Sequence, residues 1–241
     1  MTVVSRPHRK IWPKRLPHEL VVPQTTLGFN LEVAATRYPD KAAYVFFGRA
    51  LSYVQLKQQA DALAGWLQSV GVKKGDRVAL YMQNCPQFVV ALYGILRADA
   101  VVVPVNPMNR AEEFSHYITD PQSKAVVCSA DLAGFVDQAN LALPSEQRVP
   151  QVLVTRYTDA MPEAALDPVE APSPALEAWL RAEHALPAGF TRWADALAAG
   201  LSPAAPRAGP DDLALLPYTS GTTGLPKGCM HSHRTLMANA I

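Results

Sequence analysis

Apolar positions along the chain follow two alternating spacings, one typical of helices and one of strands. The clearest helical pattern begins at Ser52, which forms a capping-box pattern with Gln55, and ends at Gly71, where a C-terminal cap belongs. Residues three and four positions apart form its single apolar face, which consists of Leu56, Ala60, Leu63, Leu67 and Val70. This pattern predicts a helix with one side packed on a core.

Short apolar runs lie between such helical patterns. They predict strands over residues 42–47, 77–81, 101–105, 124–129, 151–155 and 213–218. Helices are predicted over residues 29–38, 84–98 with Asn84 as the cap, 111–119 and 131–141, and from about Ser232 onward. Strands that alternate with helices in this way imply βαβ units. We therefore predict an α/β fold with a doubly wound, mainly parallel sheet.

The pattern divides the chain into a basic N-terminal arm, residues 1–25, and a partial α/β domain, residues 26–241. Within the domain, residues 157–210 hold eight of the 21 prolines and break the alternation. We interpret them as a surface excursion with short helices near Trp179 and Trp193. The final helical pattern has barely begun where the sequence stops. We therefore expect a piece of a longer protein, with an exposed apolar face that favours self-association, for example as a homodimer.

Composition and charge narrow the class of protein. The 241 residues are 49% hydrophobic and carry a net charge of +1, which excludes a disordered tail and a dedicated nucleic-acid binder. The longest apolar run, residues 88–96, is too short to cross a bilayer, so no transmembrane segment is expected. The basic arm could make a peripheral contact with an anionic membrane, but a solvated arm is the favoured interpretation. Three widely spaced cysteines indicate reduced thiols and a cytoplasmic location; they are Cys85, Cys128 and Cys229.

The candidate chemistry lies in the segment YTSGTTGLPKG at residues 218–228, at the end of the last predicted strand. Its glycines let the backbone approach a ligand closely, and the exposed N–H groups can converge on an anion. Hydroxyl side chains and one lysine add further donors. The predicted phosphate ligands are Thr219, Ser220, Gly221, Thr222, Thr223, Gly224 and Lys227. A Walker A loop is disfavoured, because it needs a hydroxyl residue after the lysine and Gly228 stands there.

This segment resembles the phosphate-binding signature of the adenylate-forming superfamily, which includes acyl-CoA synthetases, aryl-CoA ligases, luciferases and the adenylation domains of peptide synthetases. Its continuation CMHSHR at residues 229–234 is most similar to fatty-acyl-CoA synthetases. Four other segments occur in the order and spacing of that family: LSY at 51–53, GDRV at 75–78, NCP at 84–86 and VPVNP at 103–107. The resemblance covers residues 26–155 and 211–241.

The resemblance implies the N-terminal part of a large adenylation domain and a two-step ligase that uses ATP, Mg²⁺ and CoA. A carboxylic acid, expected to be a medium- or long-chain fatty acid, would form an acyl-adenylate, and CoA would then displace AMP. Residues 219–224 would cradle the β- and γ-phosphates; Lys227 and His233 would be catalytic, with His233 near the acyl-adenylate. The family's magnesium, ribose and C-terminal lysine positions would lie beyond residue 241. No metal ligand is therefore assigned, and we expect the chain alone to be inactive.

Two alternatives stay open: a ligase for an aryl, short-chain or amino acid, and a non-catalytic nucleotide-binding or interaction fragment. Among other residues, His231 and His233 lack a third ligand for zinc, and His231 is expected to face solvent. Asp99 stands where relatives of the superfamily have glycine, and we expect it to end a helix in the left-handed conformation. His116 is interpreted as part of an exposed helix face, and Cys229 as a packing residue.

Overall fold

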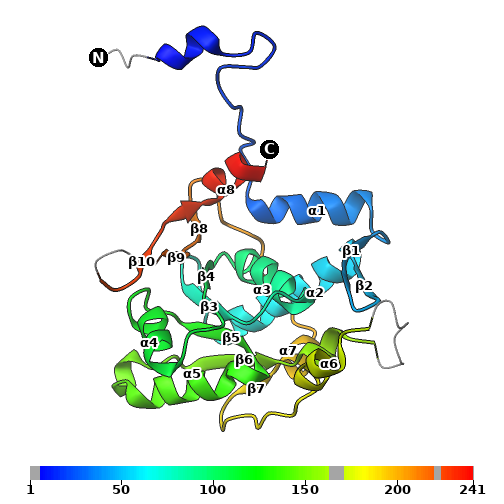
Figure 1. The fold of residues 1–241 in the computed structure, drawn as a ribbon, viewed down its shortest axis with the longest axis vertical. Coiled ribbons are helices and arrows are strands. Elements are labelled where there is room, and N and C mark those ends of the chain that lie inside the picture. The colour runs from blue at the N-terminus through cyan, green and yellow to red at the C-terminus, as the bar shows by residue number, and fades with distance from the viewer. Residues whose placement is uncertain (1–5, 163–170, 220–223, 241) are drawn as a thin grey trace.

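A seven-stranded sheet forms the centre of the computed structural model, which describes residues 6–162, 171–219 and 224–240 (Figure 1). The strands lie in the order β11-β8-β4-β3-β5-β6-β7, and only the β11–β8 pair is antiparallel. Their bounds are Arg77–Tyr81 for β3, Val101–Pro104 for β4, Ala125–Ser129 for β5, Gln151–Thr155 for β6, Thr191–Arg192 for β7, Leu213–Leu215 for β8 and His231–Ser232 for β11. This order confirms the predicted doubly wound α/β fold.

Helices cover both faces of the sheet and form two separate apolar clusters. One face carries α1 (Leu27–Arg37), α2 (Tyr53–Ser69), α3 (Pro86–Arg97), α6 (Pro174–Leu180) and α7 (Trp193–Ala198), and the other carries α4 (Ala111–Thr119) and α5 (Ala130–Ala142). Side chains of β3 alternate between them: Val78 and Leu80 belong to the first cluster, Ala79 and Tyr81 to the second. A strand covered on both faces must be apolar throughout, which explains the continuous apolar runs in the sequence.

Several local signals act as the sequence predicts. At the start of α2, the backbone N–H of Gln55 donates to the Ser52 hydroxyl at 3.3 Å and the Ser52 N–H donates to the Gln55 side chain at 2.9 Å. Asp99 follows α3 in the left-handed region, with φ of 61°. The expected cap at Asn84 is wrong, because α3 begins two residues later at Pro86. Proline suits the first turn of a helix, where its missing N–H would have no partner.

A short hairpin precedes α2. Strand β1 (Ala42–Phe46) pairs antiparallel with β2 (Arg49–Ser52) in a sheet of its own. The sequence predicted the first strand but not the second; between them Gly48 has a φ of 79°, which glycine adopts readily. Strand β2 has four residues and one large apolar side chain, Leu51, which is too few to show the alternation typical of a strand. Only its pairing with β1 defines it as a strand.

The interpretation of residues 157–210 as a surface excursion is wrong for part of that segment. The expected short helices are present as α6 and α7, but β7 adds an edge strand to the central sheet beside β6. The Trp193 side chain is buried, and the carbonyl oxygen of Leu201 lies against Gly65 of α2, where a Cβ would come within 2.3 Å of it. The buried residues of this segment lie in stretches too short to show a helical or strand spacing of apolar positions, so the sequence pattern did not indicate them.

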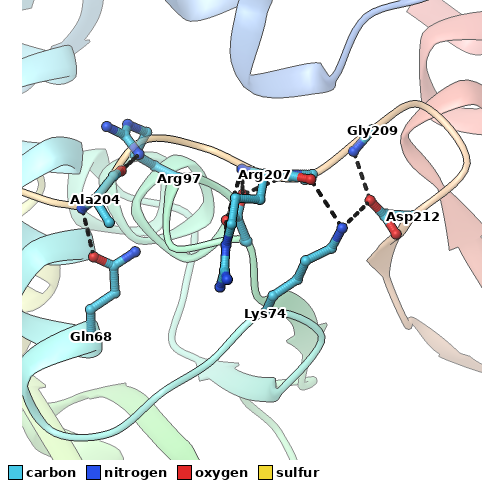
Figure 2. Close-up of polar contacts among 9 residues, drawn as sticks. Gln68, Lys74, Arg97, Ala204, Arg207, Gly209 and Asp212 are labelled. Atoms are coloured by element: carbon cyan, nitrogen blue, oxygen red, sulfur yellow. Dashed lines mark hydrogen bonds and ion pairs between the residues drawn. The ribbon is translucent and has the colours of Figure 1, made fainter.

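Residues 201–212, which we call the strap, run from α7 to β8 across the ends of α2 and α3 (Figure 2). Side chains from these helices and from the turn before β3 hold its backbone: Gln68 accepts from the N–H of Ala204, Arg97 donates to the carbonyl of Ala204, and Lys74 donates to the carbonyl of Arg207. Lys74 also pairs with the Asp212 carboxylate at 2.7 Å. The strap therefore enters β8 from a position set by side chains of the core helices.

The N-terminal arm lies away from the sheet in Figure 1. It contains one turn of 3-10 helix, Pro7–Ile11, with no buried residue. The indole N–H of Trp12 donates to the carbonyls of Leu16 and Pro17 at 3.2 and 3.1 Å. The arm's end at residue 25 and the other domain boundaries stay predictions.

Candidate phosphate-binding site

A small antiparallel hairpin carries two of the predicted phosphate ligands. Strand β9 (Tyr218–Thr219) pairs with β10 (Lys227–Gly228) so that Thr219 stands opposite Lys227. The single strand predicted over residues 213–218 is split into β8 and β9, since Pro217 has no N–H to donate to a sheet. The hairpin follows the carboxyl end of β8, a parallel strand of the central sheet, which is where open α/β sheets bind ligands.

Thr219 and Lys227, the strand pair next to the connecting segment, are exposed, and so is Gly224 within that segment. The other predicted ligands, Ser220, Gly221, Thr222 and Thr223, lie outside the described residues. Within the described part of the chain, no ion pair engages Lys227. An exposed ammonium group opposite a hydroxyl is suited to receive an anion from solvent.

The base of the hairpin is closely packed. A Cβ at Gly228 would lie 3.1 Å from the Leu216 side chain and 3.2 Å from the Tyr218 ring, so glycine allows the hairpin to lie against its own base. The N–H of Cys229 donates to the carbonyl of Pro217 at 2.8 Å, and the Cys229 side chain is half-buried. These contacts fix where the two strands separate.

Helix α4 contacts the hairpin, which overturns the interpretation of His116 as part of an exposed face. His116 is half-buried and its Nε2 lies 2.8 Å from the carbonyl oxygen of Pro226. The Tyr218 hydroxyl donates to the carboxylate of Asp120, directly after α4. Burial, and then Asp120, raise the pKa of Tyr218 well above its ordinary value, so the phenol keeps its proton and donates. Sequence reasoning missed this contact because 110 residues separate His116 from Pro226.

His233 is buried at the start of α8 (His233–Ala240). Its Nδ1 accepts the backbone N–H of Leu27 at 3.1 Å, and its own backbone N–H donates to the carbonyl of Asp212. Burial lowers the pKa of His233, and this outweighs the opposing attraction of Asp212 and Asp99. The imidazole is therefore neutral, with its hydrogen on Nε2. These bonds tie His233 to α1 and the strap; within the described residues, no hydrogen bond joins His233 to the hairpin.

His231, expected to face solvent, is half-buried in β11 opposite Leu215. Among the described residues, no three His, Cys, Asp or Glu side chains converge as a metal site would require. Within the same ranges, no helix has the length and apolar content to cross a bilayer.

An open, mostly parallel sheet with a glycine- and threonine-rich segment at its carboxyl edge defines an open α/β protein, a class that binds its ligands at that edge. Solved structures share this fold. The apo structure of MbtA from Mycobacterium smegmatis is 28% identical with a TM-score of 0.71, over 91% of this chain and 36% of that one. The inhibitor-bound N-terminal domain of FACL13 from Mycobacterium tuberculosis is 29% identical with a TM-score of 0.64, over 87% of this chain and 44% of that one.

Residues 31–241 match the family of AMP-binding enzymes, and the chain belongs to that family. The family assignment made from the YTSGTTGLPKG segment is thereby confirmed. Among curated proteins, the long-chain-fatty-acid–CoA ligase of Bacillus subtilis is 33% identical over 240 residues, which are 98% of this chain and 41% of that protein. The chain thus spans about two fifths of the length of this relative.

Proposed function

We propose that this chain supplies the phosphate-binding part of an ATP-dependent ligase that activates a carboxylic acid. In the first step a carboxylate oxygen attacks the α-phosphorus of ATP, and pyrophosphate leaves. In the second step the thiol sulfur of CoA attacks the acyl carbonyl, loses its proton, and AMP leaves. The observation that carries the proposal is the hairpin that sets exposed Lys227 opposite Thr219 at the carboxyl edge of the sheet.

The proposed role of the hairpin follows from the charge that the first step moves. Negative charge on the β- and γ-phosphates grows as pyrophosphate departs, so a fixed ammonium group and hydroxyl donors stabilise the transition state more than the ground state. Thr219 and Lys227 supply these groups from the described hairpin. Residues 220–223 complete the predicted cradle.

His233 has a different role in this proposal. Its Nδ1 already accepts a backbone N–H, and burial holds the ring neutral. Only the Nε2 hydrogen is left to donate. We propose that His233 orients the acyl-adenylate by hydrogen bonding rather than by transferring a proton.

The proposed substrate is a long-chain fatty acid, because the Bacillus subtilis relative carries that activity in its name. An aryl, short-chain or amino acid is the alternative. Since the described residues form no carboxylate cluster, we propose that Mg²⁺ arrives on the ATP phosphates, with few or no ligands from these residues. A cytoplasmic location and self-association complete the proposal, with the basic arm in solvent as the favoured state and a peripheral membrane contact as the alternative.

The test has two measurements on the same preparations. The first is ATP binding by calorimetry, on the wild-type chain, on Lys227→Ala, and on Lys73→Ala as a matched control, since Lys73 is an exposed lysine in a turn away from the hairpin. Losing a hydrogen bond to a charged group costs about 1.5–3 kcal/mol, so Lys227→Ala is expected to weaken ATP binding about 10- to 100-fold. Equal losses in both variants would contradict the assigned role of Lys227.

The second measurement is carboxylate-dependent ATP–pyrophosphate exchange with fatty, aryl and amino acids. Exchange with a fatty acid that Lys227→Ala removes supports the ligase and its substrate class. ATP binding without exchange by any acid, in this chain and in a longer form that extends past residue 241, favours the non-catalytic alternative. Transfer of phosphate to an acceptor without AMP formation would refute adenylation.

A further inference from the structure

The hairpin of β9 and β10 rests on one helix, α4, through a contact at each of its strands. On one strand, Tyr218 donates its hydroxyl hydrogen to Asp120. On the other side, the carbonyl of Pro226 lies 2.8 Å from His116 Nε2. Because a carbonyl oxygen only accepts, Nε2 of His116 carries the hydrogen and donates it.

Both contacts lie one residue from a proposed phosphate ligand. Tyr218 directly precedes Thr219, and Pro226 directly precedes Lys227. The peptide unit is planar, so holding the Pro226 carbonyl also fixes the N–H of Lys227 and the direction in which the chain enters β10. The ring of Pro226 restricts its φ and removes a further degree of freedom.

Aromatic rings surround the Tyr218 contact. The Tyr218 ring meets His116 edge-on, with centroids 5.4 Å apart, and Tyr117 in the same manner at 4.9 Å. Edge-to-face pairs at these separations are favourable beyond the apolar area they bury. The His116 ring therefore packs beside the hairpin, while its Nε2 hydrogen bond is the contact that holds the Pro226 carbonyl in place.

Helix α4 is firmly held. Phe114, Tyr117 and Ile118 are buried, and the ring of Phe114 stacks on Tyr81 of β3 at 4.6 Å. At its start, the N–H of Arg110 donates to the carboxylate of Glu113 at 2.8 Å. A helix anchored in this way on the central sheet can act as a fixed support for an exposed hairpin.

We propose that His116 and Asp120 are positioning residues for phosphate binding: from α4 they hold the two strands of the hairpin, so that Thr219 and Lys227 already point toward the polyphosphate before it arrives. This inference rests on the proposed function and adds a residue pair to it. Preorganisation of this kind raises affinity because ordering the hairpin no longer opposes binding.

The experiment separates the hydrogen bond of His116 from its ring. His116→Phe keeps a ring against Tyr218 but has no donor, whereas His116→Gln keeps an amide donor and has no ring. His184→Ala is the control, since His184 is exposed in a loop distant in sequence from both elements. A neutral hydrogen bond contributes about 0.5–1.5 kcal/mol, so His116→Phe is expected to weaken ATP binding about three- to ten-fold, with His116→Gln within about two-fold of wild type.

Thermal unfolding accompanies each titration. The positioning role is supported if His116→Phe binds ATP more weakly at an unchanged Tm and His116→Gln binds ATP as the wild type does. Equal binding in the two variants and the wild type overturns it. Tyr218→Phe, which removes the donor to Asp120 and keeps the ring, is a second variant with the same expectation, should a His116 variant fail to fold.

Amide hydrogen exchange distinguishes failure of this inference from failure of the proposed function. The reporter is the N–H of Cys229, which bonds to Pro217 at the base of the hairpin. Faster exchange in His116→Phe than in His116→Gln would show that the His116 hydrogen bond from α4 holds the hairpin. This result would support the inference even if the wild-type chain binds no ATP, which would contradict the proposed function alone. Weaker ATP binding with unchanged exchange would overturn the inference, because His116 would then act on ATP directly.

Discussion

Asp99 offers the sharpest test of how the strap is held. Its side chain is only 3% exposed, and its backbone is left-handed with φ of 61°. The carboxylate accepts the N–H of Arg207 at 3.0 Å and the N–H of Ala208 at 3.0 Å. The Arg207 guanidinium, 3.8 Å away and 71% exposed, adds little because solvent screens it.

The perturbation is Asp99→Gly, with Asp99→Asn beside it. Two hydrogen bonds to a buried carboxylate contribute about 1.5–3 kcal/mol each, so their loss costs about 3–6 kcal/mol. Glycine relieves the left-handed backbone by about 1 kcal/mol, which leaves a net loss of about 2–5 kcal/mol. Asparagine tolerates the same backbone and keeps one acceptor oxygen, so we expect it to fall between wild type and glycine.

Urea unfolding measures the free energy of unfolding of each variant. Gln122→Gly is the matched control, because Gln122 is also left-handed, with φ of 52°, and its exposed side chain makes no hydrogen bond to the residues that the structure describes. This control is expected to gain about 1 kcal/mol, because glycine relieves the left-handed backbone there as it does at position 99. If Asp99→Gly is as stable as wild type or more stable, the backbone relief exceeds the carboxylate bonds and the reasoning is refuted.

Three further predictions concern the packing of α2, the junction at α8 and a helix cap. Gly65→Ala places a Cβ 2.3 Å from the carbonyl oxygen of Leu201, so we expect the free energy of unfolding in urea to fall by about 1–3 kcal/mol. Gly134→Ala is the control: this glycine lies in a helix with open space around it, so the free energy of unfolding should rise by up to about 1 kcal/mol. The folded-state pKa of His233 is lowered from 6.5. The contribution of His233 to the free energy of unfolding is therefore present above pH 6.5 and is lost as the pH falls through the folded-state pKa. A urea midpoint that stays constant from about pH 7.5 to about pH 5 would contradict this prediction. Ser52→Ala removes the cap of α2 and is expected to cost about 0.5–2 kcal/mol by the same assay, while Ser52→Thr stays within a few tenths.

Local signals in the sequence located most of the regular elements. The runs at Arg77–Tyr81 and Gln151–Thr155 are strands with the predicted bounds, because a strand covered on both faces needs an unbroken apolar run. The cap at Ser52 was predicted because it depends on neighbours within a few positions. The left-handed conformation at Asp99 was predicted from the resemblance, because relatives have glycine at that position. The cap of α3 was misplaced by one residue, at Asn84 instead of Cys85, since Asn84 and Pro86 are both acceptable near a helix start.

Elements defined by long-range pairing left weaker signals. Strand β7 has two residues and is a strand only because β6 lies beside it. Trp193 is buried because α7 packs on α2 and β6, which the composition of a proline- and alanine-rich segment hides. The phosphate-loop signature was readable because its chemistry lies in consecutive residues, whereas the position of the hydrogen on the His233 ring depends on the backbone N–H of Leu27, 206 residues away.

The sequence by itself determined the alternating α/β order, the cap of α2 and the chemical character of the segment around Lys227, because each depends on neighbouring residues. Only the tertiary structure decided what that segment rests on. Strands β4 and β8 are parallel neighbours in the sheet, so α4, which follows β4, and the hairpin, which follows β8, leave the sheet at the same edge. Strand order, and not spacing along the chain, therefore brings His116 to Pro226.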